Sequence, residues 1–356
     1  MERSSYRIID ANFNRAREAV RVIEDYCRFA LNCDSLSHRS RQLRHNLCAT
    51  ISELDAERLI ASRDTVHDVG VGSAVDNQMQ RTKLHDCFTA AAKRLPEALR
   101  TIAEVAQTIN PAIALKIENL RYIAYTLEKD IIVLASTVEK FKRVKLYVII
   151  TCDSDSSEPK VLQLTTSCAT SGADCIQLRV KNAEDNKFFG IAEEFAKICR
   201  RENVISIIND RADIAIAVGA NGVHLGQADL PIGKVRALEI TPLIIGKTTH
   251  SPQQIQAACG EMPTYVSIGP VFATTTKPEL LPLGLDYVTM SVKTLESSGV
   301  GHVAIGGINL KNIESVLRAG AERIAVCSAV TESPDPAEMC RAFKEKITSF
   351  EHKLQS

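Results

Sequence analysis

The feature that most constrains the fold is a series of eight short runs rich in β-branched and other apolar residues, all after Lys145. Stretches with apolar residues every three or four positions, typical of amphipathic helices, separate the runs. The runs are Leu146–Thr151, Cys175–Val180, Ile205–Asn209, Gly222–Leu225, Leu243–Gly246, Tyr265–Gly269, His302–Gly306 and Arg323–Val326. Eight strands alternating with helices predict an α/β fold, a (β/α)8 TIM barrel. A doubly wound open sheet is the alternative, but no G-x-G-x-x-G string follows the first run.

The residues before these runs have a helical pattern throughout, which predicts an all-α helical domain at 1–133. A polar and charged segment at 134–144 is the expected linker to a barrel domain at 145–350. The helical part contains an internal repeat, because Arg15–Ile23 and Arg94–Ile102 share the frame R-x-x-E-A-φ-R-x-I, where φ is apolar. The repeated arginines and glutamates predict either a solvated face of ion pairs or a pocket for an anion.

Composition excludes several classes of partner. Lys plus Arg and Asp plus Glu both number 43, so net charge gives no reason to expect nucleic acid or an acidic membrane surface. No apolar run is long enough to span a bilayer, and the N-terminus has no signal-peptide core. The eleven cysteines are scattered without Cys-x-x-Cys spacing, which predicts reduced, mostly buried thiols in a cytoplasmic protein.

Polar side chains gather directly after the predicted strands, where a TIM barrel carries its active site. In chain order they are Gln177, Arg179 and Lys181; Asn209 and Asp210; His224, Gln227 and Asp229; Thr248, Thr249 and His250; the loop from Gly269 to Glu279; Gly306 and Gly307; and Cys327 and Ser328. Each group alone is typical of a helix cap or a turn. Their joint occurrence at one end of a barrel predicts an active site.

The charged members of this set suit a magnesium diphosphate. Asp210 and Asp229 follow neighbouring strands, and Mg²⁺ usually takes one or two carboxylates together with phosphate oxygens. Positive charge around the same mouth comes from Arg179, Lys181 and Lys277.

The loops after the last two strands suit a second phosphate. Gly307 and Ser328 fall where barrels commonly bind a monophosphate group. Two phosphate sites without an evident nucleophile predict transfer between two phosphorylated small molecules, with the diphosphate as leaving group. A phosphate-barrel isomerase is the other enzymatic alternative, but it needs a carboxylate base that has no metal to bind.

The strings QLRVK, IIND, GVHLGQADLP, GPVFATTTKPE, AIGGI and VCSAV, in this order and spacing, resemble thiamine-phosphate synthase. The resemblance covers Lys145 to about Ile347. It implies that 4-amino-2-methyl-5-hydroxymethylpyrimidine diphosphate loses pyrophosphate in a dissociative step, with help from its own 4-amino group. The thiazole nitrogen of 4-methyl-5-(2-phosphoethyl)thiazole then captures the cation, which gives thiamine phosphate.

The resemblance also implies roles for individual residues. Arg179, Lys181, Lys277 and Thr248 are the expected catalytic residues, and Mg²⁺, bound by Asp210 and Asp229, is the expected cofactor. Residues expected to hold the pyrimidine diphosphate are Gln177, Arg179, Lys181, Asn209 and Lys277. Those expected to contact the thiazole substrate are Thr274, Thr276, Gly307, Cys327 and Ser328. Thr248 is a substrate-binding residue as well, where the family usually has serine, and Thr275 and His250 have no assigned role.

The helical domain, with RIIDANFNRAREAVRVIEDYCRF, LRHNL and LRYIAYTLEKD, is similar to an alternative hydroxymethylpyrimidine-phosphate kinase. That resemblance implies ATP as a further partner and a bifunctional chain, although no Walker A string or protein-kinase motif is present. A docking or oligomerisation module without chemistry is the alternative, and a homo-oligomer is one option that the sequence leaves open. For the barrel, the non-enzymatic alternative is a regulator that binds thiazole phosphate.

Overall fold

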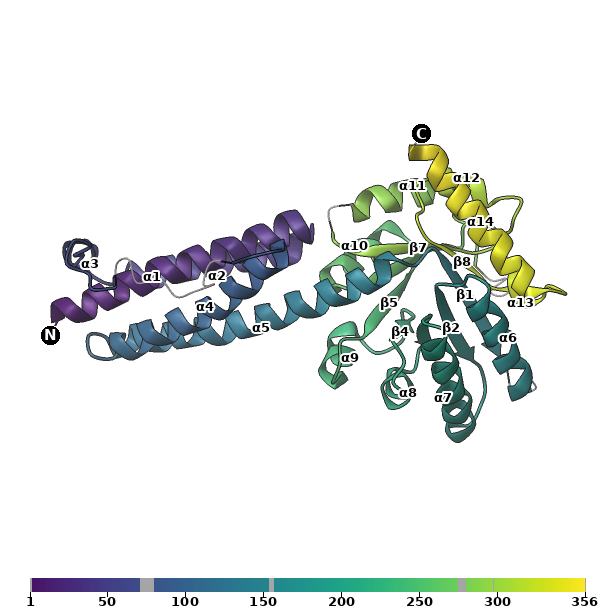
Figure 1. Ribbon diagram of the computed structural model, residues 1–356, viewed down its shortest axis with the longest axis horizontal. Helices are drawn as coiled ribbons and strands as arrows, with labels where there is room; N and C mark the ends of the chain where they lie inside the picture. Colours follow the sequence, from purple (N-terminus) through teal and green to yellow (C-terminus); the bar gives the residue numbers. More distant parts are fainter. Residues whose placement is uncertain (1, 71–79, 154–156, 275–279, 297, 356) are drawn as a thin grey trace. The chain divides into compact units, whose positions relative to one another are not determined.

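The computed structural model describes residues 2–70, 80–153, 157–274, 280–296 and 298–355 (Figure 1). The chain divides into two compact units, Met1–Ile132 and Val133–Ser356. No helix among the described residues combines the length and the apolar character needed to cross a membrane. All eleven cysteines are free thiols, and seven of them are buried.

The second unit is a closed barrel of eight parallel strands in the order β1 to β8, so the predicted TIM barrel is confirmed. The strands are β1 Leu146–Cys152, β2 Cys175–Val180, β3 Ile205–Asn209, β4 Gly222–Leu225, β5 Ile244–Thr249, β6 Tyr265–Ile268, β7 Gly301–Ile305 and β8 Ile324–Val326. The helices are α6 Glu158–Thr170, α7 Asp185–Arg201, α8 Ala212–Ala217, α9 Ile232–Leu238, α10 Pro252–Glu261, α11 Gly284–Leu295, α12 Ile313–Arg318, α13 Ser328–Thr331 and α14 Pro336–Gln355.

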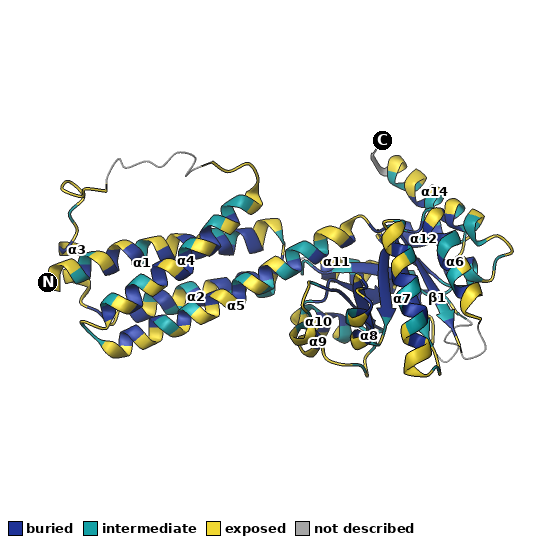
Figure 2. Cartoon of the chain, turned by 60° about the horizontal axis from the view of Figure 1, so that its bottom comes forward, coloured by how far each residue is buried: buried dark blue, intermediate teal, exposed yellow. Residues whose placement is uncertain are grey.

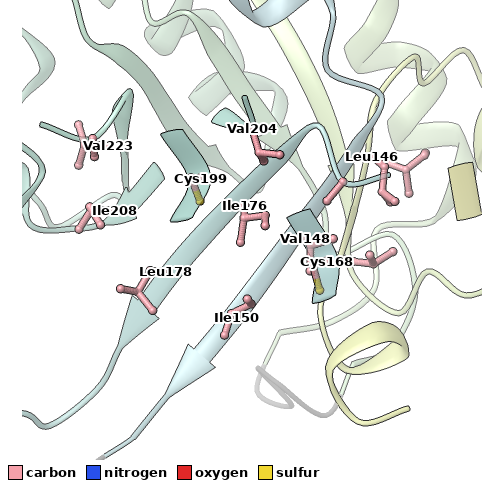
Figure 3. Packing of buried hydrophobic residues seen from close by; sticks show 14 of the residues in the cluster. Leu146, Val148, Ile150, Cys168, Ile176, Leu178, Cys199, Val204, Ile208 and Val223 are labelled. Carbon is pink, nitrogen blue, oxygen red and sulfur yellow. The ribbon is translucent and has the colours of Figure 1, made fainter. Parts of the chain in front are cut away.

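Alternate residues of each strand face opposite sides of the barrel wall, because successive side chains of a strand point to opposite faces. On β1, Leu146, Val148 and Ile150 belong to the apolar layer between strands and helices (Figure 3). Tyr147 and Ile149 belong instead to a separate apolar cluster inside the barrel. The inner face therefore carries its own small core, with the side chains that form the cavity above it.

A residue from outside the strands closes the lower end of this inner core. Phe141, in the last turns of helix α5 (Pro111–Lys142), is 1% exposed. Its ring stacks on that of Tyr265, with the ring centroids 4.3 Å apart and an interplanar angle of 8°. The segment 134–144, expected to be a linker, is thus helical as far as Lys142. The reason is a stripe of Leu134, Thr137 and Phe141 on one side of the helix, all of them buried.

The first unit consists of helices, as expected. They are α1 Glu2–Asp25, a π-helical turn at Tyr26–Ala30, α2 Asp34–Ile51, α3 Ala56–Ala61, α4 Leu84–Ala106 and the first part of α5. Figure 2 shows buried stripes along α1, α2 and α4, with exposed residues on their other sides.

The two copies of the internal repeat lie in α1 and α4, which pack against each other. The helices are antiparallel, because Glu18 pairs with Arg94 at 2.8 Å while Tyr26, in the π-helical turn that follows α1, stacks on Phe88, nearer the start of α4. Three repeat arginines, Arg21, Arg94 and Arg100, are partly or fully exposed and pair with carboxylates. The structure therefore favours the ion-paired face over an anion pocket for these three arginines.

Candidate active site

A cavity of about 490 Å³ opens at the carboxyl ends of the barrel strands. Its wall contains residues from the ends of β2 to β6 and from the loops that follow β6, β7 and β8. This is the place at which a TIM barrel assembles side chains from several strands. The expected position of the site and the observed position of the cavity are therefore the same.

Most of the candidate site residues line the cavity. They are Gln177, Arg179, Asn209, Asp210, Thr248, Thr274, Gly307, Cys327 and Ser328. Lys181 is exposed just beyond β2, and neither it nor Asp229 contributes to the cavity wall. Thr276 and Lys277, together with Thr275, lie outside the described residues.

Arg179 is the cationic side chain in the described part of the cavity wall. Its Nη1 is buried and has no hydrogen-bond partner among the described residues. A buried guanidinium donor without a partner is costly unless an anion accepts from it. Arg179 is thus placed and prepared for a carboxylate or a phosphate in the cavity.

The two candidate metal-binding carboxylates occupy well-defined turns. Asp210 has a left-handed backbone with φ of 64°, and its N–H donates to the carbonyl of His224 at 2.8 Å. Asp229 Oδ2 accepts from the N–H of Gly226 at 2.6 Å. Lys247, which is only 6% exposed, donates from Nζ to the carbonyl of Gly226 at 2.9 Å. Lys247 therefore anchors the turn that carries Asp229, a contribution that the sequence analysis missed.

The loop after β6 is held by β7 and by His250. The N–H of Val271 donates to the carbonyl of Ile305 at 2.8 Å, and His250 Nδ1 lies 2.6 Å from the carbonyl oxygen of Gly269. Gly307, with φ of 61°, packs so closely that an added Cβ would lie 2.4 Å from the carbonyl oxygen of Ala273. These contacts fix the start of the loop that leads to Thr274, and they give His250 a structural place.

The floor of the cavity is a continuous series of hydrogen bonds, which we call the floor network. Successive members lie 2.6, 2.7, 2.8, 3.0 and 3.0 Å apart in the order Asn209, Gln177, Tyr147, Tyr265, His224 and Thr248. The two tyrosines lie near the start of their strands, so the polar residues that follow the strand ends give no indication of them. Inward alternation on β1 and β6 was the signal that could have found them.

The two tyrosines of the floor network stay protonated. Burial raises the pKa of both Tyr147 and Tyr265 well above the ordinary value of a phenol. Each phenol therefore has one proton to donate at any ordinary pH, and the floor carries no phenolate charge.

Both units are similar to known protein families. The family described as Thiamine monophosphate synthase matches residues 146–330, and the family described as ThiD2 family matches residues 7–130. The thiamine-phosphate synthase of Gloeobacter violaceus is 36% identical over 96% of this chain and 96% of its own. That of Rhodopirellula baltica is 37% identical over 92% of this chain and 88% of its own. The thiamine phosphate pyrophosphorylase structure from Pyrococcus furiosus is 29% identical, with a TM-score of 0.52, and covers 58% of this chain and 96% of its own.

Proposed function

The chain belongs to the thiamine-phosphate synthase family, transferases of thiamine biosynthesis, and from this premise we propose the reaction that its cavity performs. The barrel joins 4-amino-2-methyl-5-hydroxymethylpyrimidine diphosphate to 4-methyl-5-(2-phosphoethyl)thiazole. Pyrophosphate leaves and thiamine phosphate forms. The observation that carries this proposal is Arg179, which lines a cavity of about 490 Å³ and whose buried Nη1 has no hydrogen-bond partner among the described residues.

Two groups of residues in the cavity wall would receive the two substrates. Arg179, Gln177 and Asn209 line the part of the wall proposed for the pyrimidine diphosphate, and Gln177 donates to Asn209. Lys181 and Lys277 complete the proposed set of diphosphate-binding residues. Thr274, Gly307, Cys327 and Ser328 line the part of the wall proposed for the thiazole phosphate. Thr276, which lies outside the described residues, is a further residue proposed to contact this substrate.

Asp210 and Asp229 are the residues proposed to bind Mg²⁺, and their chemistry fits that ion. They are two carboxylates, and the described residues contain no cluster of three or more His, Cys, Asp or Glu side chains that could hold a metal by itself. Such a pair is typical of Mg²⁺, which completes its coordination shell with substrate phosphate oxygens and water. When bound, the ion neutralises charge on the diphosphate.

The protein's own contribution to the reaction is orientation and charge stabilisation. Arg179 donates to the leaving diphosphate more strongly as negative charge develops on it, which lowers the barrier to cleavage of the C–O bond. The cavity holds the thiazole nitrogen against the carbon that loses the diphosphate. The thiazole nitrogen attacks with its lone pair and carries no proton, so the reaction requires no general base.

For the helical unit we propose phosphorylation of hydroxymethylpyrimidine phosphate by ATP, which would supply the substrate of the barrel. The match of residues 7–130 to the ThiD2 family supports an enzymatic unit rather than a spacer. Docking or oligomerisation without chemistry is the alternative, and the paired arginines of α1 and α4 are equally compatible with it.

One experiment on the full chain tests both proposals. Ready-made pyrimidine diphosphate, thiazole phosphate and Mg²⁺ should give thiamine phosphate and pyrophosphate in equal amounts, measured by chromatography. The barrel proposal fails if no thiamine phosphate appears. Pyrimidine monophosphate and ATP in place of the diphosphate should give the same product together with ADP. Product from the diphosphate alone, without ADP formation from the monophosphate, would favour docking over a kinase.

Asp210→Asn should raise the Mg²⁺ concentration needed for half-maximal turnover by about tenfold or more, because it removes one charged ligand. Titration calorimetry of Mg²⁺ into the protein with pyrophosphate should show the same weakening. Asp286→Asn, an exposed carboxylate on α11, is the matched control and should change neither quantity. Equal Mg²⁺ dependence in Asp210→Asn and the wild type would remove Asp210 from the metal site.

A further inference from the structure

We propose that all hydrogen bonds of the floor network are donated in one direction, toward Asn209. Thr248 is then a hydrogen-bond acceptor for a group in the cavity. The inference rests on the proposed function, because it assigns the donor that Thr248 meets as the exocyclic amino group of the pyrimidine. Tyr147, Tyr265 and His224 are then positioning residues, which act on the substrate through Thr248.

The direction is set at the Asn209 end of the network. Gln177 donates from Nε2 to Asn209 Oδ1 at 2.6 Å, so its Oε1 faces the other way. The hydroxyl of Tyr147 donates to that oxygen at 2.7 Å. The single proton of Tyr147 is therefore already used, and its oxygen can only accept from its next neighbour.

The same direction of donation then follows for the bond between the two tyrosines and for the bond between Tyr265 and His224. The hydroxyls of Tyr147 and Tyr265 are 2.8 Å apart, so a proton must lie between them, and only Tyr265 can supply it. Tyr265 has then used its own proton, and its oxygen accepts from His224 Nδ1 at 3.0 Å. The raised pKa of both phenols excludes a phenolate, which would break this order. His224 thus carries hydrogen on Nδ1, and in the neutral form of the ring its Nε2 is unprotonated.

Thr248 takes its role from that tautomer. A neutral imidazole with hydrogen on Nδ1 has a lone pair on Nε2, and Thr248 Oγ1 lies 3.0 Å from Nε2. Thr248 must therefore donate its proton to Nε2 of His224, which leaves its lone pairs facing the cavity that it lines. Lone pairs repel an ionised phosphate oxygen and suit an N–H donor.

The amino group of the pyrimidine is the N–H donor in the proposed reaction. When Thr248 accepts from this group, the nitrogen releases more electron density into the ring. That release stabilises the cation formed as the diphosphate leaves, so the contact is stronger in the transition state than in the ground state. The floor network would in this way assist bond cleavage without touching the leaving group.

The opposite direction is chemically complete and supplies the outcome that would overturn the proposal. Rotation of both the Gln177 and the Asn209 amide by a half turn would reverse every bond. His224 would then carry hydrogen on Nε2, and Thr248 would donate into the cavity. The two directions therefore differ at one observable place, the protonated nitrogen of His224.

Nitrogen NMR of the full chain labelled with ¹⁵N-histidine measures that place without any substrate. The His224 signals, assigned by their loss in His224→Gln, should show a pyrrole-type nitrogen at Nδ1 and a pyridine-type nitrogen at Nε2. The reverse pattern overturns the proposal. Tyr265→Phe removes the acceptor of the Nδ1 proton and should alter this pattern. The matched control Tyr287→Phe, a buried tyrosine of α11 away from the cavity wall, should leave the pattern and turnover unchanged.

Kinetics then tests the identity of the donor. With the normal diphosphate, Thr248→Val should lower kcat by about ten- to a hundredfold, the size of one lost hydrogen bond, and Thr248→Ser should restore it. With a pyrimidine diphosphate whose amino group is replaced by hydrogen, the same substitution should have almost no further effect. An equal loss on both substrates would show that Thr248 contacts another group. Wild-type turnover of the normal substrate separately checks the proposed function.

Discussion

Arg179→Ala should lower turnover of the synthase reaction by about a hundred- to a thousandfold, the usual effect of removing one preorganised donor to developing charge. The side chain is prepared for this role in the free protein, since its buried Nη1 has no partner among the described residues. Removing it also removes a buried donor that lacks a partner, so the fold should lose little stability. Activity and stability are therefore expected to respond differently.

Steady-state turnover with both substrates saturating, together with urea unfolding, measures the two effects. Arg200→Ala is the matched control, because Arg200 is an exposed arginine of α7 that donates to the carbonyl of Gly219 at 3.1 Å, away from the cavity wall. It should retain normal turnover. Wild-type turnover in Arg179→Ala would contradict the diphosphate assignment.

Gly246→Ala should both destabilise the barrel, by about 3 kcal/mol, and abolish most of its activity. A Cβ at this position of β5 would lie 2.2 Å from Cζ of Tyr265 and 2.4 Å from both Nδ1 of His224 and the Tyr265 hydroxyl. Tyr265 is 1% exposed and stacked on Phe141, so it has no space into which to move. The added methyl group must therefore displace the floor network.

Gly190→Ala provides the control, because an added Cβ at that position of α7 meets no atom within 4 Å. Alanine in the middle of a helix is expected to stabilise by about 0.5–1 kcal/mol relative to glycine. Urea unfolding should thus move in opposite directions for the two substitutions. A Gly246→Ala protein with wild-type stability and turnover would show that the floor adapts to an added methyl group.

The sequence predicts the barrel well because each strand is a short apolar run between helical patterns. The prediction is least accurate where a polar side chain is buried. The prediction for β5 ended at Gly246, whereas the strand continues to Thr249 through Lys247, a lysine that is only 6% exposed. A buried lysine is rare, and what keeps it there is the carbonyl of Gly226, a contact between two strand ends that no local pattern reveals.

Several side chains of the candidate site could be predicted because the ends of parallel strands meet at one edge. The floor could not be predicted in the same way, because Tyr147 and Tyr265 are far apart in sequence and neither is near a strand end. Their hydroxyls meet across the barrel at 2.8 Å only once the strands close into a ring. The positions of Asp229 and Lys181 could not be predicted either. Both residues follow a strand in a loop, and the alternation of side chains along a strand does not determine the conformation of a loop.

The stacking of Phe141 on Tyr265 shows that the packed barrel and the match to the synthase family model begin at different residues. The match to the synthase family model begins at residue 146, whereas the ring that supports the cavity floor belongs to residue 141. That ring is carried by α5, a helix that starts at Pro111 within the helical unit. An ancestral fusion or an engineered exchange of front domains would thus alter a packing partner of Tyr265 if it replaced the end of this helix. The region inherited with the catalytic barrel is therefore longer than the region that the synthase family model matches.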